Sequence, residues 1–279
     1  MLNYLRRGFY KIIPLANKLT LLKIEFLQLK SEVNFHIRKI NTKENTHLQN
    51  YLYFIHYPLF SFTESIIILC ENNKSHVAKA LLRSLFEAHI NIIYHQLADS
   101  EQKLAISAKE GFDIKIKGVK EIQDLIRRYP NLKSKDPSNL FSEEWLKKAL
   151  TWSETERQAI MKGNNLSEKD KAIDLKSKAI KCDKEYSKEA EKGHFERLYT
   201  IIYRQLSPPS HLNIERIQVF INQRETGEYL FSDGEDNNFI ASEAIEVCVV
   251  FTKDLYEHGV IKGKIPNVVS RLEKLLKSK

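Results

Sequence analysis

An arginine and a histidine with six residues between them stand in the run Tyr203-Arg204-Gln205-Leu206-Ser207-Pro208-Pro209-Ser210-His211. The double proline must end the apolar helix before it, because proline lacks an amide donor and crowds the preceding turn. Such a break can bring His211 back toward Arg204. Histidine titrates near neutral pH, whereas arginine stays charged and binds phosphate oxygens through paired hydrogen bonds. The pair would suit metal-independent RNA cleavage, in which His211 activates the ribose 2′-hydroxyl and Arg204 stabilises charge on the phosphate.

A second set of polar side chains lies on a helix that we expect from Ser75 to about Leu97. That helix is apolar nearly all round, which is typical of a central helix. Arg83, Glu87, Asn91 and Tyr94 recur at spacings of four, four and three, so they fall on one narrow stripe. A charged stripe on a buried helix must be paired or line a polar cavity, because unpaired buried charge is costly. Two interpretations stay open: an Arg83–Glu87 ion pair in the core, or a stripe that lines a site.

Each feature also has a purely structural interpretation. Ser207 can cap a backbone group, and His211 can hydrogen-bond across a helix break without any catalytic role.

Arg83 and His89 have a similar spacing to Arg204 and His211, but on a regular helix their side chains point about 120° apart, so we discard that pair as a site. The sequence has no Gly-rich phosphate loop, no HExxH and no GxSxG motif, and its histidines do not cluster at metal-ligand spacing. We therefore expect neither a metal nor a cofactor.

The two segments together resemble a known family. The runs Ala80-Leu81-Leu82-Arg83-Ser84-Leu85-Phe86-Glu87-Ala88 and Tyr203-Arg204-Gln205-Leu206-Ser207…His211 are similar to an uncharacterised bacterial and archaeal helical family, domain of unknown function 5677, over roughly residues 45–260. That family has no established activity. The second run also resembles the Arg-x4–6-His signature of the HEPN superfamily, compact helical ribonucleases and nucleotide-binding proteins common in toxin–antitoxin and phage-defence systems.

The HEPN resemblance implies a function and a set of site residues. Arg204 and His211 would be the catalytic pair, in an active site formed by a dimer. The side chains that would shape and orient the pocket are Arg83, Glu87, Tyr203 and Ser207. The chain departs from the signature at Gln205, where these nucleases usually carry Asn, Asp or His, and in its double proline.

The resemblance favours a HEPN-like metal-independent endoribonuclease or phage-defence or toxin effector, with RNA as a partner and a homodimer or protein complex as the assembly. The alternative is a non-catalytic helical binding or scaffold module of a defence or regulatory complex, in which the same residues form a buried polar network. A third hypothesis is nucleotide or small-ligand sensing in the same cavity.

The elements that position these residues are predicted to be helices. Nine glycines and seven prolines are too few for a sandwich or barrel with many tight turns. Apolar residues follow helical spacing over long stretches, and Pro58 is expected to bend the second of them. We expect an all-α fold, a bundle of long helices over residues 3–13, 15–40, 48–71, 75–97, 100–129, 195–206, 239–258 and 266–276.

One helical domain is expected over residues 1–279. Its N-terminal helices would occupy residues 1–44, a polar helical insertion residues 131–192, and one small β-hairpin residues 217–232. The insertion is rich in Lys, Glu, Ser and Asp, and the hairpin turns at the polar run 224–227.

The charge and the cysteine content indicate in which environment the protein acts. The net charge of +8 comes from the two ends, since residues 1–30 and 262–279 each carry six Lys or Arg against one Glu. Solvated tails explain this better than a nucleic-acid surface. The three cysteines stand far apart, which fits a reducing cytoplasm. The family resemblance implies that the cell is prokaryotic. The apolar stretch 51–70 contains His56, Pro58 and Glu64, so we expect a buried helix and no transmembrane segment.

Overall fold

Helices make up nearly all of the described structure. The computed structural model describes residues 18–130, 142–186, 193–203, 221–223, 229–231 and 237–278. For residues 201–203, 221–223 and 229–231 it describes the backbone alone. The predicted all-α fold is confirmed within these ranges. Residues 3–13 of the predicted N-terminal helix lie outside them.

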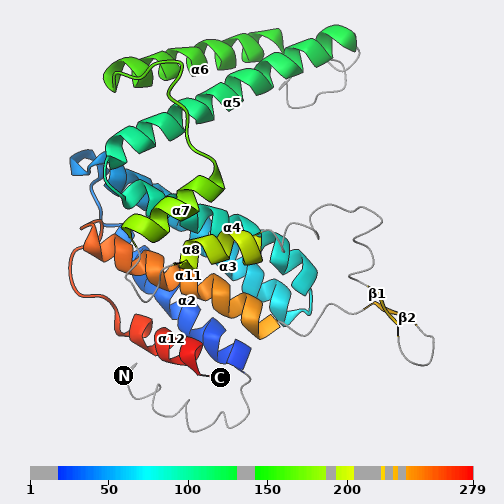
Figure 1. The fold of residues 1–279 in the computed structure, drawn as a ribbon, viewed down its shortest axis with the longest axis vertical. Coiled ribbons are helices and arrows are strands. Elements are labelled where there is room, and N and C mark those ends of the chain that lie inside the picture. The colour runs from blue at the N-terminus through cyan, green and yellow to red at the C-terminus, as the bar shows by residue number, and fades with distance from the viewer. Residues whose placement is uncertain are drawn as a thin grey trace. The chain divides into compact units, whose positions relative to one another are not determined.

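The elements follow the chain in a simple order (Figure 1). They are α2 (Lys18–Ile37), the 3₁₀ turn η1 (Thr42–Glu44), α3 (His47–Glu71), α4 (Ser75–Gln96), α5 (Ser100–Arg128), α6 (Glu143–Gly163), α7 (Leu175–Glu185), α8 (His194–Arg197), η4 (Leu198–Tyr203), β1 (Ile221–Gln223), β2 (Tyr229–Phe231), α11 (Asn237–Glu257) and α12 (Asn267–Lys277). The two strands pair antiparallel, with Asn222 opposite Leu230. The other residues of the predicted hairpin, 217–220, 224–228 and 232, lie outside the described ranges.

The chain divides into two compact units. One comprises residues 1–94 and 175–279, and the other residues 95–174. The boundaries differ from those of the predicted insertion at 131–192, because α5 belongs to the second unit and α7 to the first. Whether the two units fold as one domain stays a prediction.

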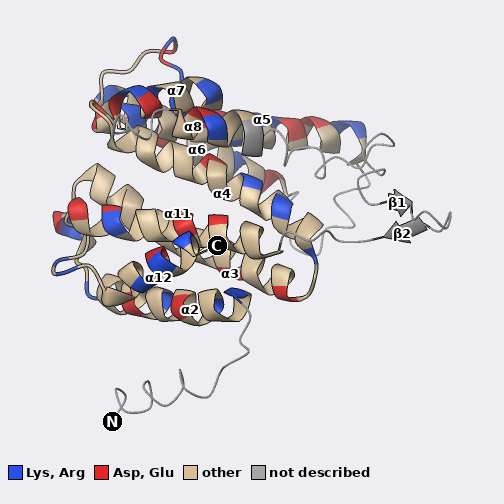
Figure 2. Ribbon diagram, turned by 60° about the horizontal axis from the view of Figure 1, so that its bottom comes forward, with Lys and Arg blue, Asp and Glu red and all other residues tan. Residues whose placement is uncertain are grey.

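The core of the first unit forms around α11, which packs against α3 and α2 (Figure 1). Figure 2 shows few charged residues on α3. Most side chains of α11 are buried, among them Ile245, Phe251 and Leu255, each 0% exposed. Each such side chain contributes about 1.5–3 kcal/mol by leaving water, and truncation of Phe251 to Ala is expected to cost about 3–5 kcal/mol.

Helix α3 begins at a reciprocal cap and has one buried face. The Thr46 hydroxyl accepts from the Gln49 amide at 3.1 Å, and the Gln49 side chain accepts from the Thr46 amide at 2.9 Å, which satisfies two first-turn donors. Among the described residues, α3 is the one helix long and apolar enough to cross a membrane. One such helix is weak evidence of a span, because the core helix of a soluble domain has the same composition. Its buried face includes Leu59 and Phe60.

The second unit is a helical hairpin. Helices α5 and α6 pack side by side over a small core of Val119, Ile126 and Leu146, with Ile122 and Leu150 packed against it. The apolar and charged residues of α5 lie on opposite faces, which is typical of a helix with one solvated face.

The three cysteines, Cys70, Cys182 and Cys248, are buried and carry no disulfide. Cys248 lies against α3, where its Sγ is 3.1 Å from the Thr63 hydroxyl. A buried thiol of this kind behaves as a small apolar side chain.

Candidate functional site

The predicted catalytic residues Arg204, Ser207 and His211 lie outside the described residues. Tyr203 ends η4, and only its backbone is described. Helix η4 has π-helical geometry and continues α8 without a break. π-helical turns are rare and are frequently found at functional sites. The predicted catalytic segment therefore starts directly after an unusual backbone geometry.

The polar stripe of α4 is only partly buried. Glu87 is exposed and so is its neighbour Ser84, whereas Arg83 is half-buried. Of the two interpretations, an Arg83–Glu87 ion pair in the core does not fit the exposed Glu87, and a stripe that lines a site stays a prediction. Solvent hydrates the Glu87 carboxylate, so no buried partner is required for it.

The far end of the stripe contacts α7. The Lys178 ammonium donates to Asn91 Oδ1 at 2.7 Å and lies 5.4 Å from the centre of the Tyr94 ring. Asn91 also donates from Nδ2 to the Glu87 carbonyl at 2.9 Å. These contacts fasten α7 to α4 through a charge-assisted hydrogen bond and a cation–π contact, which is a structural role.

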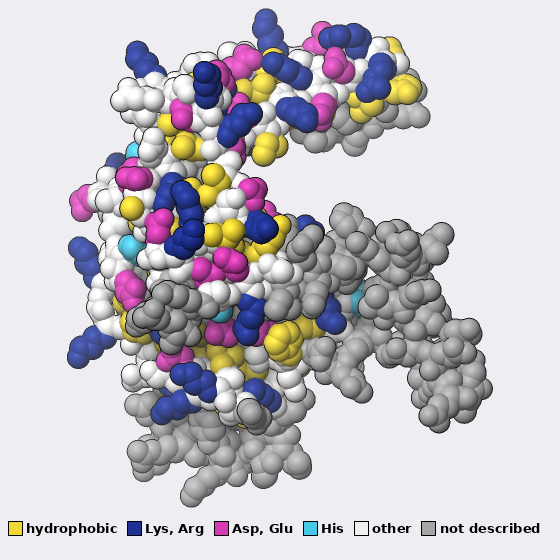
Figure 3. Space-filling model, in the orientation of Figure 1, with side chains coloured by type: hydrophobic (Ala, Val, Ile, Leu, Met, Phe, Trp, Pro, Cys, Tyr) yellow, Lys and Arg dark blue, Asp and Glu magenta, His cyan; other side chains and the backbone are white. Residues whose placement is uncertain are grey.

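A small pocket lies between α4, α8, η4 and α11. Its volume is about 30 Å³, and its lining residues are Phe86, His89, His194, Leu198, Glu243, Glu246, Val247 and Val250. All of them belong to the first unit. Figure 3 shows acidic side chains gathered over α8 and α11 on this face of the molecule. The pocket therefore combines imidazoles and carboxyl groups above an apolar wall.

The start of α8 is fixed by Asp183 from the end of α7. Its carboxylate, 6% exposed, accepts from the backbone amides of Phe195 at 3.0 Å and Glu196 at 2.8 Å. Unpaired first-turn amides and the positive end of the helix favour such an anion. Gly193 precedes the helix at φ +83°, a left-handed conformation that glycine adopts without strain. These contacts place His194 at the pocket.

His89 is a neutral, buried base in this pocket. It is 4% exposed, its ring lies 5.7 Å from that of Phe195, and its Nδ1 is buried without a hydrogen-bond partner among the described residues. Burial, and then the nearby charge of His194, lower the pKa of His89 to about 3. At neutral pH its ring is therefore uncharged, with one nitrogen as acceptor and the other as donor.

Glu243 is a carboxyl group that titrates near neutral pH. Burial, and then repulsion from Glu246, raise its pKa to about 7 against the opposing effect of Arg197. Glu243 and Glu246 are three positions apart on α11, so their side chains are neighbours. A carboxyl group with this pKa can exchange protons at physiological pH.

The chemistry of the pocket is that of proton exchange and hydrogen bonding. Among the residues that the structure describes, no group of three or more His, Cys, Asp or Glu side chains is arranged to hold a metal ion. The interior has room for about one water-sized group. The pocket can thus receive the polar end of a ligand, while the larger part of that ligand would lie outside it.

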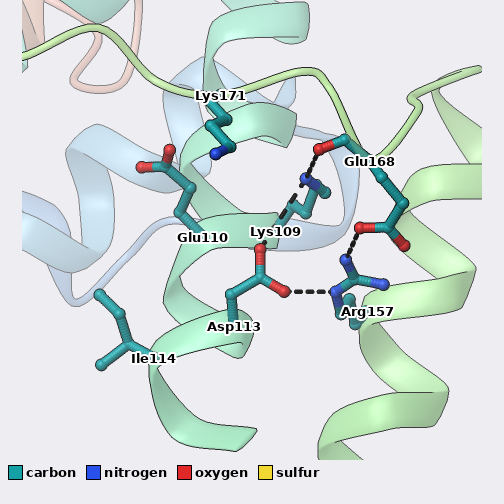
Figure 4. Close-up of a pocket in the computed structure, with 7 residues that line it drawn as sticks. All are labelled: Lys109, Glu110, Asp113, Ile114, Arg157, Glu168 and Lys171. Atoms are coloured by element: carbon teal, nitrogen blue, oxygen red, sulfur yellow. Dashed lines mark hydrogen bonds and ion pairs between the residues drawn. The ribbon is translucent and has the colours of Figure 1, made fainter. Parts of the chain in front are cut away.

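The second unit has a larger charged pocket of about 470 Å³ (Figure 4). Lys109, 2% exposed, donates to the carbonyls of Asp170 at 3.0 Å and Glu168 at 3.4 Å. Arg157 donates to the carboxylates of both Asp113 and Glu168. These bonds hold the segment 164–174 across α5 and α6, and pairing of the charges within the protein favours a structural role.

The sequence analysis missed the pocket. His89 was discarded because it points away from Arg83, and that geometric argument holds without excluding His89 from another site. A lone histidine on an otherwise apolar helix was the available signal. Glu243 and Glu246 were a second one, since two carboxylates interrupt the apolar run of α11. His194 and Asp183 gave no signal, because they lie in polar sequence.

Comparison with known proteins identifies the family. Residues 49–229, more than half of the chain, match the model of a family of unknown function, DUF5677. The matched range contains the runs 80–88 and 203–211, on which the predicted resemblance rested. No curated protein and no solved structure matches the chain. The protein therefore belongs to the family of unknown function DUF5677.

Proposed function

We propose that this protein is a HEPN-like, metal-independent endoribonuclease that acts as a phage-defence or toxin effector. Arg204 would bind the scissile phosphate and His211 would take the proton of the ribose 2′-hydroxyl. We also propose that it acts in the cytoplasm of a prokaryotic cell, as a homodimer with RNA as its substrate.

The proposal rests on the position of Arg204 in the chain, directly after the π-helical segment η4. The first residue of η4, Leu198, lines the pocket that holds His89, His194 and Glu243. An unusual helical geometry thus precedes the predicted catalytic segment, and it begins at a pocket that contains a group titrating near pH 7.

Cleavage of a fluorescent single-stranded RNA in the presence of EDTA tests the proposal. The His211→Ala variant is expected to lose at least about 100-fold in rate, the usual contribution of a general acid or base. His47→Ala, on the exposed first turn of α3, is the matched control and should cleave at the wild-type rate. Circular dichroism and melting curves establish that both variants fold. Equal rates in wild type and His211→Ala, or no cleavage by wild type, would refute the proposal.

The alternative, a non-catalytic binding module, has its own support in an exposed apolar surface of α2 and α3. We define this α2–α3 surface by its exposed apolar side chains, Ile24, Leu27, Phe35, Phe54, Tyr57 and Ile68, which are between 39% and 69% exposed. Contiguous apolar area of this kind is typical of protein interfaces. If wild type cleaves no RNA and His211→Ala merely lowers the melting temperature, the binding module becomes the better hypothesis.

The two helices present this surface on one side. Lys23 of α2 pairs with Glu71 of α3 at 2.6 Å, and Lys30 pairs with Glu64 at 2.5 Å. At 100° per residue, Leu27 lies next to the two lysines on α2, and Tyr57 and Ile68 lie next to the two glutamates on α3. The exposed apolar side chains therefore border the ion pairs on the same side of the helix pair.

A further inference from the structure

The two tryptophans of the chain lie on the surface of one helix in the second unit. Trp145 and Trp152 belong to α6 and are 42% and 51% exposed. Seven residues turn an α-helix by about 700°, so both indole rings lie on the same side of α6, about 10 Å apart along its axis. Burial of an indole ring removes a large apolar area from water, and the described chain covers these two rings only in part.

A lysine of α5 lies beside one of these rings. Lys115 Nζ is 5.1 Å from the centre of the Trp152 ring and 5.0 Å from that of the Phe112 ring, and the two rings meet edge to face at 5.4 Å. Attraction to the rings holds the ammonium group at this place. Lys115 is exposed and pairs with no carboxylate among the residues that the structure describes. Its charge is therefore available to an anion from solution.

Charged side chains surround the rings. Lys148 and Glu156 lie on the same side of α6 as the two tryptophans, and Lys148 pairs with Glu144 at 2.7 Å. Figure 3 shows charged side chains of both signs spread over α5 and α6. The centre of a protein–protein interface is depleted of charge, because its main anchors are fully desolvated. Surfaces that bind single-stranded nucleic acid instead combine aromatic rings with cations.

We propose that Trp145, Trp152, Phe112 and Lys115 form a platform that binds single-stranded RNA. One base would stack on the indole ring of Trp152 and another on that of Trp145, while Lys115 binds a phosphate. The spacing of the indole rings corresponds to roughly three nucleotides of a stacked strand, at about 3.4 Å each. The proposal rests on the ribonuclease proposal for the identity of the ligand, and it gives the RNA a binding surface apart from Arg204 and His211.

Stacking should supply most of the affinity of this α5–α6 platform. Lys115 and Lys148 are balanced by Glu144 and Glu156, so the platform has little net charge. Every base has a face that can stack on an indole ring, and stacking therefore tolerates many sequences. Binding should depend only weakly on salt, because each phosphate contact on a single strand changes the slope of log Kd against log salt by about 0.7.

Tryptophan fluorescence reports on this platform alone, because the chain has no other tryptophan. The probe is a 2′-O-methylated oligoadenylate of about twelve nucleotides, a length within the range of known single-strand sites. It lacks the 2′-hydroxyl that the proposed cleavage requires, so it stays intact. Titration of the full chain with this probe should quench the fluorescence in a saturable way. Inorganic polyphosphate, which has no bases, should not quench it.

Substitutions in the platform make the test specific, with Kd measured by the anisotropy of a labelled probe. Trp152→Ala should raise Kd by about tenfold, whereas Trp152→Phe keeps an aromatic ring and should stay within about threefold of wild type. Lys115→Ala should reduce the salt slope by about 0.7. Lys117→Ala is its control, because Lys117 is 79% exposed on the opposite side of α5 and should leave both Kd and slope unchanged.

The outcomes separate this proposal from the ribonuclease proposal. Unchanged fluorescence of wild type in excess probe, or an equal Kd for Trp152→Ala, overturns the platform, and a protein would then be the better candidate for the exposed rings. Cleavage of unmodified RNA by wild type in that case leaves the ribonuclease proposal standing alone. Quenching and a raised Kd for Trp152→Ala, without any cleavage by wild type, support the platform and refute the ribonuclease.

Discussion

Arg271 of α12 donates from Nε and Nη2 to the same carboxylate oxygen of Glu25 in α2, at 2.8 and 2.7 Å. Its Nη2 also donates to Gln28 Oε1 at 3.0 Å. The Glu25 side chain is 5% exposed, whereas that of Arg271 is 36% exposed. The last described helix is thereby held against the first through a carboxylate that has little access to water.

Replacement of Arg271 by Ala is expected to destabilise the protein. The buried Glu25 carboxylate would lose two charge-assisted hydrogen bonds from Arg271, at a cost on the order of 2–3 kcal/mol because the lost partner is partly exposed. Urea denaturation measures the loss as a lower free energy of unfolding. Lys274→Ala, exposed on the same helix, is the control and should change stability by less than about 0.5 kcal/mol. An equal effect of both substitutions would show that the pair adds nothing beyond helix propensity.

Glu243 is expected to contribute less to the stability of the protein as pH rises from about 4.5 to 7. The folded state raises the pKa of Glu243 from 4.5 to about 7, so in this window the folded chain binds a proton that the unfolded chain has lost. The contribution of Glu243 to the free energy of unfolding therefore decreases with pH, whereas the lowered pKa of His89 acts in the opposite direction below about pH 6.5. At pH 8 the cost is on the order of 1–2 kcal/mol, after allowance for solvent screening.

Glu243→Gln isolates this contribution. The amide cannot ionise, so the variant should be more stable than wild type at pH 8 and similar to it at pH 4.5. Denaturant melts at several pH values measure the difference. If the two curves stay parallel from pH 4.5 to 8, Glu243 does not titrate in this range.

Arg157 is expected to control the mobility of the segment 164–174 in the second unit. Its side chain is 12% exposed and forms ion pairs with the carboxylates of Asp113 and Glu168. Arg157→Ala should accelerate amide hydrogen exchange of this segment by about tenfold. Lys148→Ala breaks the exposed pair with Glu144 on the same helix and should have little effect. Exchange as slow as in wild type would mean that Lys109 and the hydrogen bond from Ala172 to Glu110 hold the segment without Arg157.

Acid is expected to loosen the same segment. Hydrogen bonds from Arg157 lower the pKa of Glu168, and those from Ser167 lower the pKa of Asp170. A lowered pKa in the folded state stabilises the fold above the unfolded value, and the contribution is lost as pH falls through the folded one. Protection corrected for intrinsic exchange should therefore persist at pH 6 and decline below pH about 4. Uniform protection across this range would contradict the assignment.

The positions of the helices could be predicted from the sequence. Apolar spacing and breaking residues gave α3, α4, α5, α11 and α12 to within about three residues at each end, because each has one long apolar face. The same patterns could not separate residues 95–174 as a unit. Helix α5 is amphipathic whichever neighbour covers it, and only the three-dimensional contacts show that this neighbour is α6.

The candidate pocket could not be predicted for a different reason. His89, His194 and Glu243 come from three helices that are distant in sequence, and their convergence depends on a carboxylate cap from Asp183. Short motifs report local geometry, so they led to Arg204 and His211 instead. The exposure of Glu87 also depends on tertiary neighbours, because helical spacing shows that residues share a stripe but not what covers it.

The α2–α3 surface is expected to form the interface of the predicted homodimer. Phe54 and Tyr57 are 67% and 69% exposed, so changing both to Ser removes little packing within the chain and should alter stability by less than about 1 kcal/mol. Sedimentation velocity should find wild type dimeric and Phe54→Ser/Tyr57→Ser largely monomeric, because large aromatic side chains dominate interface energies. Ile114→Ser changes a side chain that is 72% exposed in the second unit, and this control should leave the dimer intact. A double variant that stays dimeric at micromolar concentration would place the interface elsewhere, and an apolar surface without a second copy on it would then favour a different protein as its partner.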